Sequence, residues 1–262
     1  MEDASGTAVV AGIGQLGSEF ALGLLRLGRT VVPVTRARNL ARVLEAARDV
    51  ELILLAVGET ALVPLLGSIP PRVKDRVALV QNELVPADWQ RAGYVEVSGV
   101  VVWFEKKAGR PIHVVRPSVA YGPRSGLLLE LLGELKVPAH AVAPDALEFE
   151  LALKNLYILV HNLAGLAVQG TVGSLWQEHA AWAREVASDV LRHQEVRFGR
   201  ALDRGALLDE LDKAVRADPG HGLAGRTAPE RLSRVLSQAR QAGIQLPALE
   251  QLNDRLDESL HA

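Results

Sequence analysis

The stretch AVVAGIGQLG, residues 8–17, decides how the first half of this chain is expected to fold. It begins as an apolar strand and turns through Gly12, Gly14 and Gly17 into an apolar-periodic segment, 15–27. This is G-x-G-x-x-G spacing after a strand and at the start of a helix, the context in which it is informative. Gly12 permits the tight turn, Gly14 lets a pyrophosphate approach the backbone, and Gly17 allows close helix packing. The stretch therefore predicts a dinucleotide site at a helix N-terminus; the alternative is a tight turn without a ligand.

The segments that follow alternate between strand and helix patterns. Strands are expected at 30–34, 51–57 and 76–81, and helices at 38–48 and 59–66. Residues 51–57 read ELILLAV, a continuous apolar run typical of a parallel strand buried on both faces. Further on, the pattern predicts adjoining strands or a hairpin within 94–105 and 111–121, a helix at 125–135 and a last strand at 137–142. This order predicts an α/β, Rossmann-type doubly wound sheet.

The second half has no strand pattern. Helices are expected at 146–168, 175–198, 203–217, 229–242 and 247–260. Prolines near residues 138 and 144 mark a boundary, so the sequence predicts a nucleotide-binding domain at 1–144 and an all-helical C-terminal domain at 145–262.

Composition excludes several classes of protein. The chain has 262 residues, a net charge of −2 and no cysteine, which argues against nucleic-acid or membrane-surface binding and against disulfides. No apolar run approaches the roughly 20 residues of a membrane span. None of the seven histidines has metal-ligand spacing on a helix, so no metal site is expected. We expect a cytoplasmic protein.

The residues after the second strand indicate which dinucleotide is bound. They read TRARN, residues 35–39, with no acidic residue before Glu45. Arg36, Arg38 and Thr35 suit a ribose 2′-phosphate, so NADP(H) is favoured over NAD(H); the alternative is a solvated helix start. The residues expected to contact the cofactor are Gly12, Ile13, Gly14, Gln15, Leu16, Gly17, Thr35, Arg36, Val57 and Asn82.

Two further stretches carry polar groups suited to chemistry. Gln81, Asn82 and Glu83 follow the fourth strand, at the edge where ligands bind in open α/β sheets. Lys154 lies within a strongly apolar helix, and Asn162, just over two turns later, is near the same face. A buried lysine is costly unless it has a partner or a task, although it could also extend to water.

Together these motifs resemble the ketopantoate reductase (2-dehydropantoate 2-reductase) family of the 6-phosphogluconate dehydrogenase-like superfamily. The resemblance spans nearly the whole chain. It rests on GIGQLG at 12–17, Gln81-Asn82, the E-L-x-x-K pattern at 150–154, Asn162-Leu163 and AGIQLP at 242–247. It implies an NADP-binding Rossmann domain joined to a helical substrate and dimerisation domain, with a cleft in which a 2-oxo acid is reduced to the 2-hydroxy acid.

The resemblance implies roles for particular residues. Lys154 would be the general acid, Asn82 would lie beside the nicotinamide, and Asn162 would bind polar groups of the substrate.

The sequence also departs from the family. Ile158 replaces a second Asn, Glu83 replaces a Gly, and Ala228 replaces a substrate-binding Glu, for which Glu230 is the candidate replacement. We therefore expect an NADPH-dependent reductase of a small carbonyl compound with an altered substrate pocket, forming possible homodimers. One alternative is a non-catalytic dinucleotide-binding sensor or partner protein. Another is an imine or amino-acid reductase, in which Glu83 or Glu230 would engage a cationic nitrogen.

Overall fold

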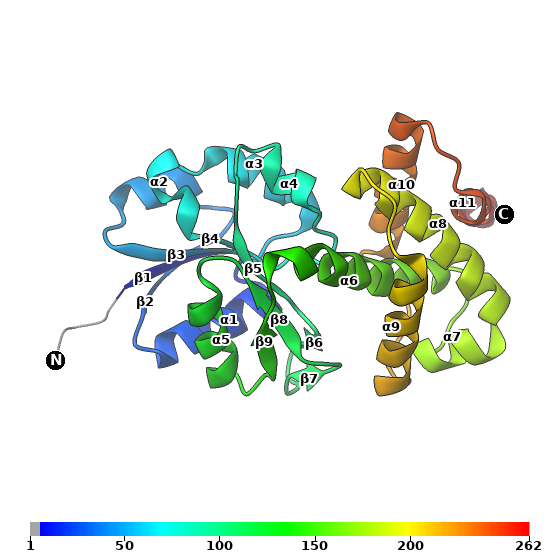
Figure 1. Ribbon diagram of the computed structural model, residues 1–262, viewed down its shortest axis with the longest axis horizontal. Helices are drawn as coiled ribbons and strands as arrows, with labels where there is room; N and C mark the ends of the chain where they lie inside the picture. The colour runs from blue at the N-terminus through cyan, green and yellow to red at the C-terminus, as the bar shows by residue number, and fades with distance from the viewer. Residues whose placement is uncertain (1–5, 262) are drawn as a thin grey trace. The chain divides into compact units, whose positions relative to one another are not determined.

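One sheet of seven strands, in the order β2-β1-β3-β4-β5-β8-β9, forms the centre of the first part of the chain (Figure 1). The strands are β1 (Thr7–Ala11), β2 (Thr30–Val34), β3 (Val50–Leu55), β4 (Val77–Leu79), β5 (Ser98–Val101), β8 (Ser118–Tyr121) and β9 (Ala139–Ala141). Neighbours from β2 to β5 pair in parallel, whereas β8 is antiparallel to β5. The order 2-1-3-4-5 leaves a switch point between β1 and β3, where ligands of such sheets bind.

Helices cover both faces of this sheet, which confirms the doubly wound prediction. The helices are α1 (Gln15–Arg26), α2 (Leu40–Ala46), α3 (Glu59–Ser68), α4 (Pro86–Gln90) and α5 (Ser125–Glu134), with a 3-10 turn η1 (Pro71–Arg76). In Figure 1, α1 and α5 lie on one face and α2, α3 and α4 on the other. The apolar strand residues predicted to be buried on both faces, such as Leu54 and Leu55, are fully buried. A small hairpin of β6 (Phe104–Glu105) and β7 (His113–Val114) confirms the predicted turn between them.

The structure is a computed structural model that describes residues 6–261, and side chains as far as residue 258. The chain divides into two compact units, Met1–Leu151 and Ala152–Ala262. The division falls within α6 (Pro144–Ala164), and the predicted domain boundary at residue 144 coincides with the beginning of this helix.

Helices and connecting loops make up the described residues of the second unit, apart from an isolated β-bridge between Thr171 and Gly222, so the helical prediction is confirmed. After α6 its helices are α7 (Val172–Glu178), α8 (Ala180–Phe198), α9 (Arg204–Ala217), α10 (Ala228–Ala242) and α11 (Pro247–His261). The prediction of one helix over 175–198 is wrong, because the backbone at His179 (φ −126°, ψ 33°) leaves the helical region and separates α7 from α8. Among the described helices, none is both long and apolar enough to span a membrane.

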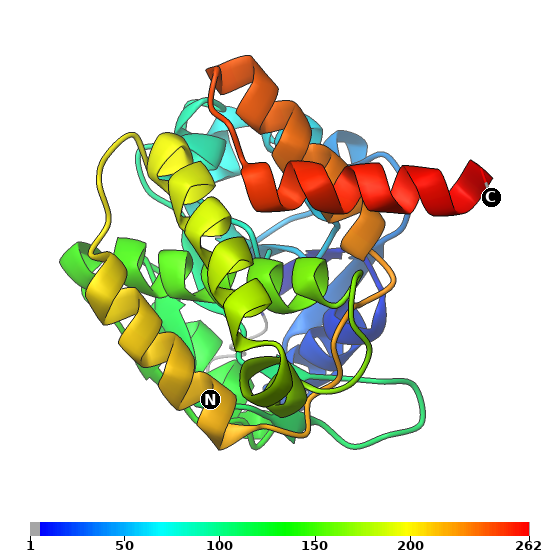
Figure 2. The same cartoon turned by 90° about the vertical axis from the view of Figure 1, so that its right-hand side faces the viewer.

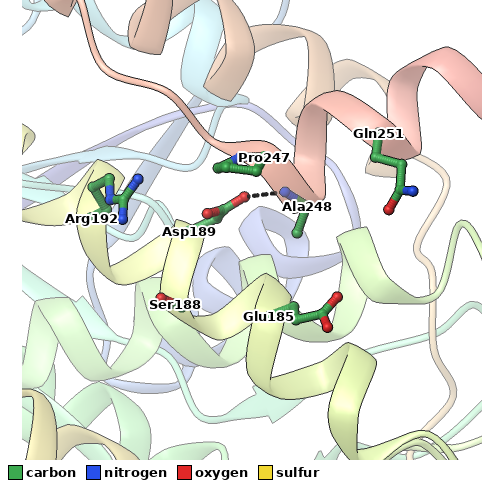
Figure 3. A pocket seen from close by; sticks show the side chains of 7 residues that line it. All are labelled: Glu185, Ser188, Asp189, Arg192, Pro247, Ala248 and Gln251. Carbon is green, nitrogen blue, oxygen red and sulfur yellow. Dashed lines mark hydrogen bonds between the residues drawn. The ribbon is translucent and has the colours of Figure 1, made fainter.

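Asp189 joins two helices of the second unit, where α8, α10 and α11 contact one another (Figure 2). Its buried carboxylate accepts a hydrogen bond from the backbone N–H group of Ala248 (2.8 Å), at the beginning of α11 (Figure 3). It accepts a second hydrogen bond from the backbone N–H group of Leu249 (3.1 Å). Burial raises the pKa of Asp189, and these two hydrogen bonds offset part of that rise. The side chain thus satisfies N–H groups that a helix start leaves without intrahelical partners.

We expect Asp189→Ala to lower the free energy of unfolding by about 1–3 kcal/mol, because two buried N–H groups lose their acceptor. The folded-state pKa of Asp189 is raised above the unfolded value. The contribution of the carboxyl is therefore complete below the unfolded pKa and declines as pH rises through the folded pKa.

Asp189→Asn keeps an acceptor oxygen and should cost less than Asp189→Ala. The stability of wild type relative to Asp189→Asn should fall with rising pH. Denaturant unfolding at several pH values measures both effects, and an Asp189→Ala variant as stable as wild type would rule out the capping role.

Candidate functional site

A cavity of about 640 Å³ opens at the carboxyl ends of β1, β2 and β3, at the switch point of the sheet. Residues 12–14 line it after β1, residues 35 and 36 with Arg38 after β2, and residues 56–58 after β3. Its volume lies within the range of about 300–1,000 Å³ that is usual for small-molecule sites. Of the residues predicted to contact a cofactor, the cavity brings together Gly12, Ile13, Gly14, Thr35, Arg36 and Val57.

The three glycines behave as their spacing predicts. Gly12 has φ +92°, and a Cβ there would clash with the carbonyl oxygen of Ala56. A Cβ on Gly17 would clash with the carbonyl oxygen of Gly12, so α1 packs closely under the turn. A Cβ on Gly14 would meet no atom within 4 Å. The first and third glycines are thus required by the fold, and the second leaves open space at the start of α1.

Two arginines after β2 differ in what they contact. Arg38 donates from its NH1 group to the carbonyl oxygen of Pro33 at 2.8 Å, which holds its side chain against the end of β2. Within the described residues 6–261, Arg36 makes no hydrogen bond or ion pair, and its side chain is exposed at the cavity. Arg36 therefore offers an uncommitted positive charge, and Thr35 beside it offers a hydroxyl.

The turn after β4 supports the wall of the cavity. Gln81 is buried, and its Nε2 donates to the carbonyl oxygens of Leu55 (2.7 Å) and Val57 (3.1 Å). This ties the end of β3, which lines the cavity, to the end of β4. Asn82 is half-buried and Glu83 is buried in the same turn.

Three of the residues predicted to contact a cofactor lie beyond the lining of this cavity, in the first turn of α1. They are Gln15, Leu16 and Gly17. Asn82, in the turn after β4, also lies outside the lining.

In the second unit, Lys154 is buried on α6, with only 7% of its surface exposed. It does not extend to water. Its Nζ lies 5.8 Å from the centroid of the Tyr157 ring, within the range of a cation–π contact. At a position this deeply buried, a cationic group interacts more strongly with an opposite charge than it would in water, because the local dielectric constant is lower.

A histidine, His161, lies about two turns after Lys154 on α6. His161 is buried, its ring contacts that of Tyr157 with centroids 4.5 Å apart, and its Nε2 accepts a hydrogen bond from Trp176 Nε1 at 3.0 Å. Burial lowers the pKa of His161 to about 3. His161 therefore stays uncharged near neutral pH and orders the aromatic side chains beside Lys154.

A hydrogen bond between two polar side chains joins α6 to α10. The NH1 group of Arg231, on α10, donates to Asn162 Oδ1 at 2.6 Å, and Arg231 is only 8% exposed. Arg231 is not among the site residues expected from the sequence, although it occupies the face of α10 that carries Leu232 and Val235, where a charged residue is unusual. Glu230, the candidate replacement for the acidic residue lost at Ala228, is exposed.

No family model and no curated protein matches this sequence. Solved structures do match. A PanE/ApbA family ketopantoate reductase from Ralstonia eutropha has 17% identity and a TM-score of 0.66, covering 96% of this chain and 97% of that one. D-mandelate dehydrogenase, solved with NADH and anilino(oxo)acetate, has 14% identity and a TM-score of 0.64, covering 98% and 99%. A dimeric ketopantoate reductase from Staphylococcus aureus has 14% identity and a TM-score of 0.62, covering 96% and 98%.

The matched structures share one architecture with this chain, a Rossmann-type sheet followed by a helical unit. Within this architecture, the chain has the fold of the ketopantoate reductases and of D-mandelate dehydrogenase over nearly its whole length. The resemblance seen in the sequence is thus confirmed at the level of the fold, in a divergent sequence.

Proposed function

We propose that this protein is an NADP(H)-dependent reductase that converts a small 2-oxo acid into the corresponding 2-hydroxy acid. The observation that carries the proposal is the glycine-lined cavity at the switch point of the sheet, with the uncommitted Arg36 at its rim. In this proposal the turn at residues 12–17 holds the pyrophosphate at the N-terminus of α1. Thr35 and Arg36 hold the 2′-phosphate. A bound NADPH would supply the hydride.

The second unit supplies groups suited to an oxygen-rich anion. Lys154 and Arg231 can only donate hydrogen bonds, and Arg231 engages the oxygen of Asn162. In the proposed reaction, Lys154 gives a proton to the carbonyl oxygen as hydride reaches the carbonyl carbon, so that a 2-oxo acid, NADPH and a proton yield a 2-hydroxy acid and NADP⁺. These donor-only groups match the acceptor oxygens of an oxo acid better than the N–H donors of a cationic imine, which favours the oxo acid over the imine or amino-acid alternative.

The proposal is tested by NADPH oxidation in the presence of ketopantoate and phenylglyoxylate, the oxo acids that correspond to the two kinds of enzyme named among the similar structures. Consumption of NADPH that depends on one of these acids supports the reductase. Tight NADPH binding with no oxidation by any acid of a wider panel would instead support the non-catalytic dinucleotide-binding alternative. Light scattering of the same sample tests the proposed homodimer.

We expect Arg36→Ala to weaken NADPH binding by about 10- to 100-fold, the cost of a lost charge-assisted contact, and to leave NADH binding unchanged. Fluorescence titration with both cofactors measures this selectivity. Arg42→Ala removes an exposed arginine of α2 outside the cavity and serves as the matched control. Equal effects of Arg36→Ala on NADPH and NADH would contradict the assignment of the 2′-phosphate to Arg36.

A further inference from the structure

The contact between Arg231 and Asn162 determines which end of the Asn162 amide faces Arg231. A guanidinium has five N–H donors and no acceptor, so only the amide oxygen can face it. The hydrogen bond from Arg231 NH1 to Asn162 Oδ1 is short, at 2.6 Å. The Nδ2 group of Asn162, with its two N–H donors, is consequently turned away from Arg231.

Those two donors are available. Within the described residues 6–261, Asn162 Nδ2 makes no hydrogen bond to the protein, and the side chain is only half-buried. Gly225 adjoins the opposite end of the amide, since a Cβ on it would lie 3.2 Å from Asn162 Oδ1. The oxygen end of the amide is therefore enclosed by protein, while the nitrogen end is open to a ligand.

Arg231 itself is held firmly. It lies on α10 beside the buried Leu232 and Val235, and burying a charged side chain is costly unless it is well hydrogen-bonded. A planar guanidinium in a packed environment also has few alternative orientations. These properties suit a residue that fixes the geometry of a neighbour.

We propose that Arg231 is a positioning residue, which locks the Asn162 amide so that its N–H groups donate to an oxygen atom of the substrate. This inference rests on the proposed function and deepens it. It assigns Asn162 the role of a donor, and it requires the substrate to present an acceptor oxygen, such as that of a carboxylate or a hydroxyl, at this point.

Asn162→Asp separates this role from a structural one. An aspartate keeps an acceptor oxygen for Arg231 and adds an ion pair, so the melting temperature should not fall. It replaces the open N–H donors by a carboxylate oxygen, which would repel an anionic substrate. We expect the affinity for ketopantoate, measured by calorimetry on NADP⁺-loaded protein, to weaken by about 10- to 100-fold. Oxidised cofactor cannot reduce the acid, so this measurement needs no turnover.

Arg231→Gln tests the lock directly. A glutamine amide can donate or accept, so Asn162 is no longer held in one orientation. We expect KM for the oxo acid to rise about 10-fold with little change in kcat and none in NADPH affinity, and Arg231→Lys to restore part of the loss. Arg240→Gln, at an exposed arginine in the last turn of α10, is the control and should leave KM unchanged.

The possible failures are distinguishable. If wild type binds the oxo acid but does not reduce it, and Asn162→Asp abolishes binding, the reductase proposal fails and the positioning role stands. If wild type reduces the acid and Asn162→Asp keeps its affinity, the positioning role is wrong and the reductase stands. If wild type neither binds nor reduces any 2-oxo acid of the panel, both are overturned.

Discussion

Replacing Lys154 by methionine is expected to lower kcat by about 100- to 10,000-fold, the usual contribution of a general acid. Methionine has a similar length and packs in apolar surroundings, so the buried site on α6 should keep its shape. The substitution removes both the proton donor and the positive charge that stabilises the developing alkoxide. NADPH affinity should not change, because Lys154 is assigned no contact with the cofactor.

Steady-state kinetics with the oxo acid measure kcat, and titration with NADPH measures the cofactor affinity separately. Lys213→Met removes an exposed lysine of α9, which pairs with Glu210, and controls for the loss of a positive charge from the second unit. A Lys154→Met enzyme with the wild-type kcat would show that the proton comes from another group.

The second large effect is expected at Gly17. Alanine usually favours a helix over glycine by about 1 kcal/mol. At Gly17, however, a Cβ would clash with the backbone oxygen of Gly12 and would lie 3.1 Å from the Cβ of Ala56. The backbone at Gly12 and the backbone at Gly17 cannot move apart without opening the turn, so the cost of the clash outweighs the helix preference of alanine. Gly17→Ala should lower the free energy of unfolding by about 1–3 kcal/mol and greatly weaken NADPH binding.

Gly133→Ala is the matched control. Gly133 lies in α5, where a Cβ would meet no atom within 4 Å. It should raise stability by about 0.5–1 kcal/mol and leave NADPH binding unchanged. Thermal unfolding and cofactor titration of both variants test the pair. A stable Gly17→Ala protein with wild-type NADPH affinity would contradict the close packing of α1.

Features set by local sequence could be predicted. The turn through Gly12 and Gly17 has a backbone requirement that is readable from spacing alone, and ELILLAV at 51–57 could hardly be anything but a buried strand. Thr35 and Arg36 reach the cavity because residues after parallel strands collect at one edge of the sheet.

Features that depend on tertiary contacts could not be predicted from the sequence. Nothing near His179 is a proline or a glycine, and the break between α7 and α8 depends on packing that an apolar periodicity does not reveal. Short α4, at Pro86–Gln90, was missed because five residues give no measurable period. Arg231 could have been noticed as a charged residue on the apolar face of α10. Its pairing with Asn162 could not have been predicted, because the two residues are 69 positions apart in the sequence.

The most direct test of the central claim follows the hydride itself. Wild-type protein would be incubated with ketopantoate or phenylglyoxylate and NADPH carrying deuterium at the transferable position of the nicotinamide. We expect a 2-hydroxy acid with deuterium on the carbon that carried the oxo group, and Lys154→Met should form it far more slowly. Bound NADPH that retains all its deuterium in the presence of every 2-oxo acid tested would contradict the assignment as a reductase.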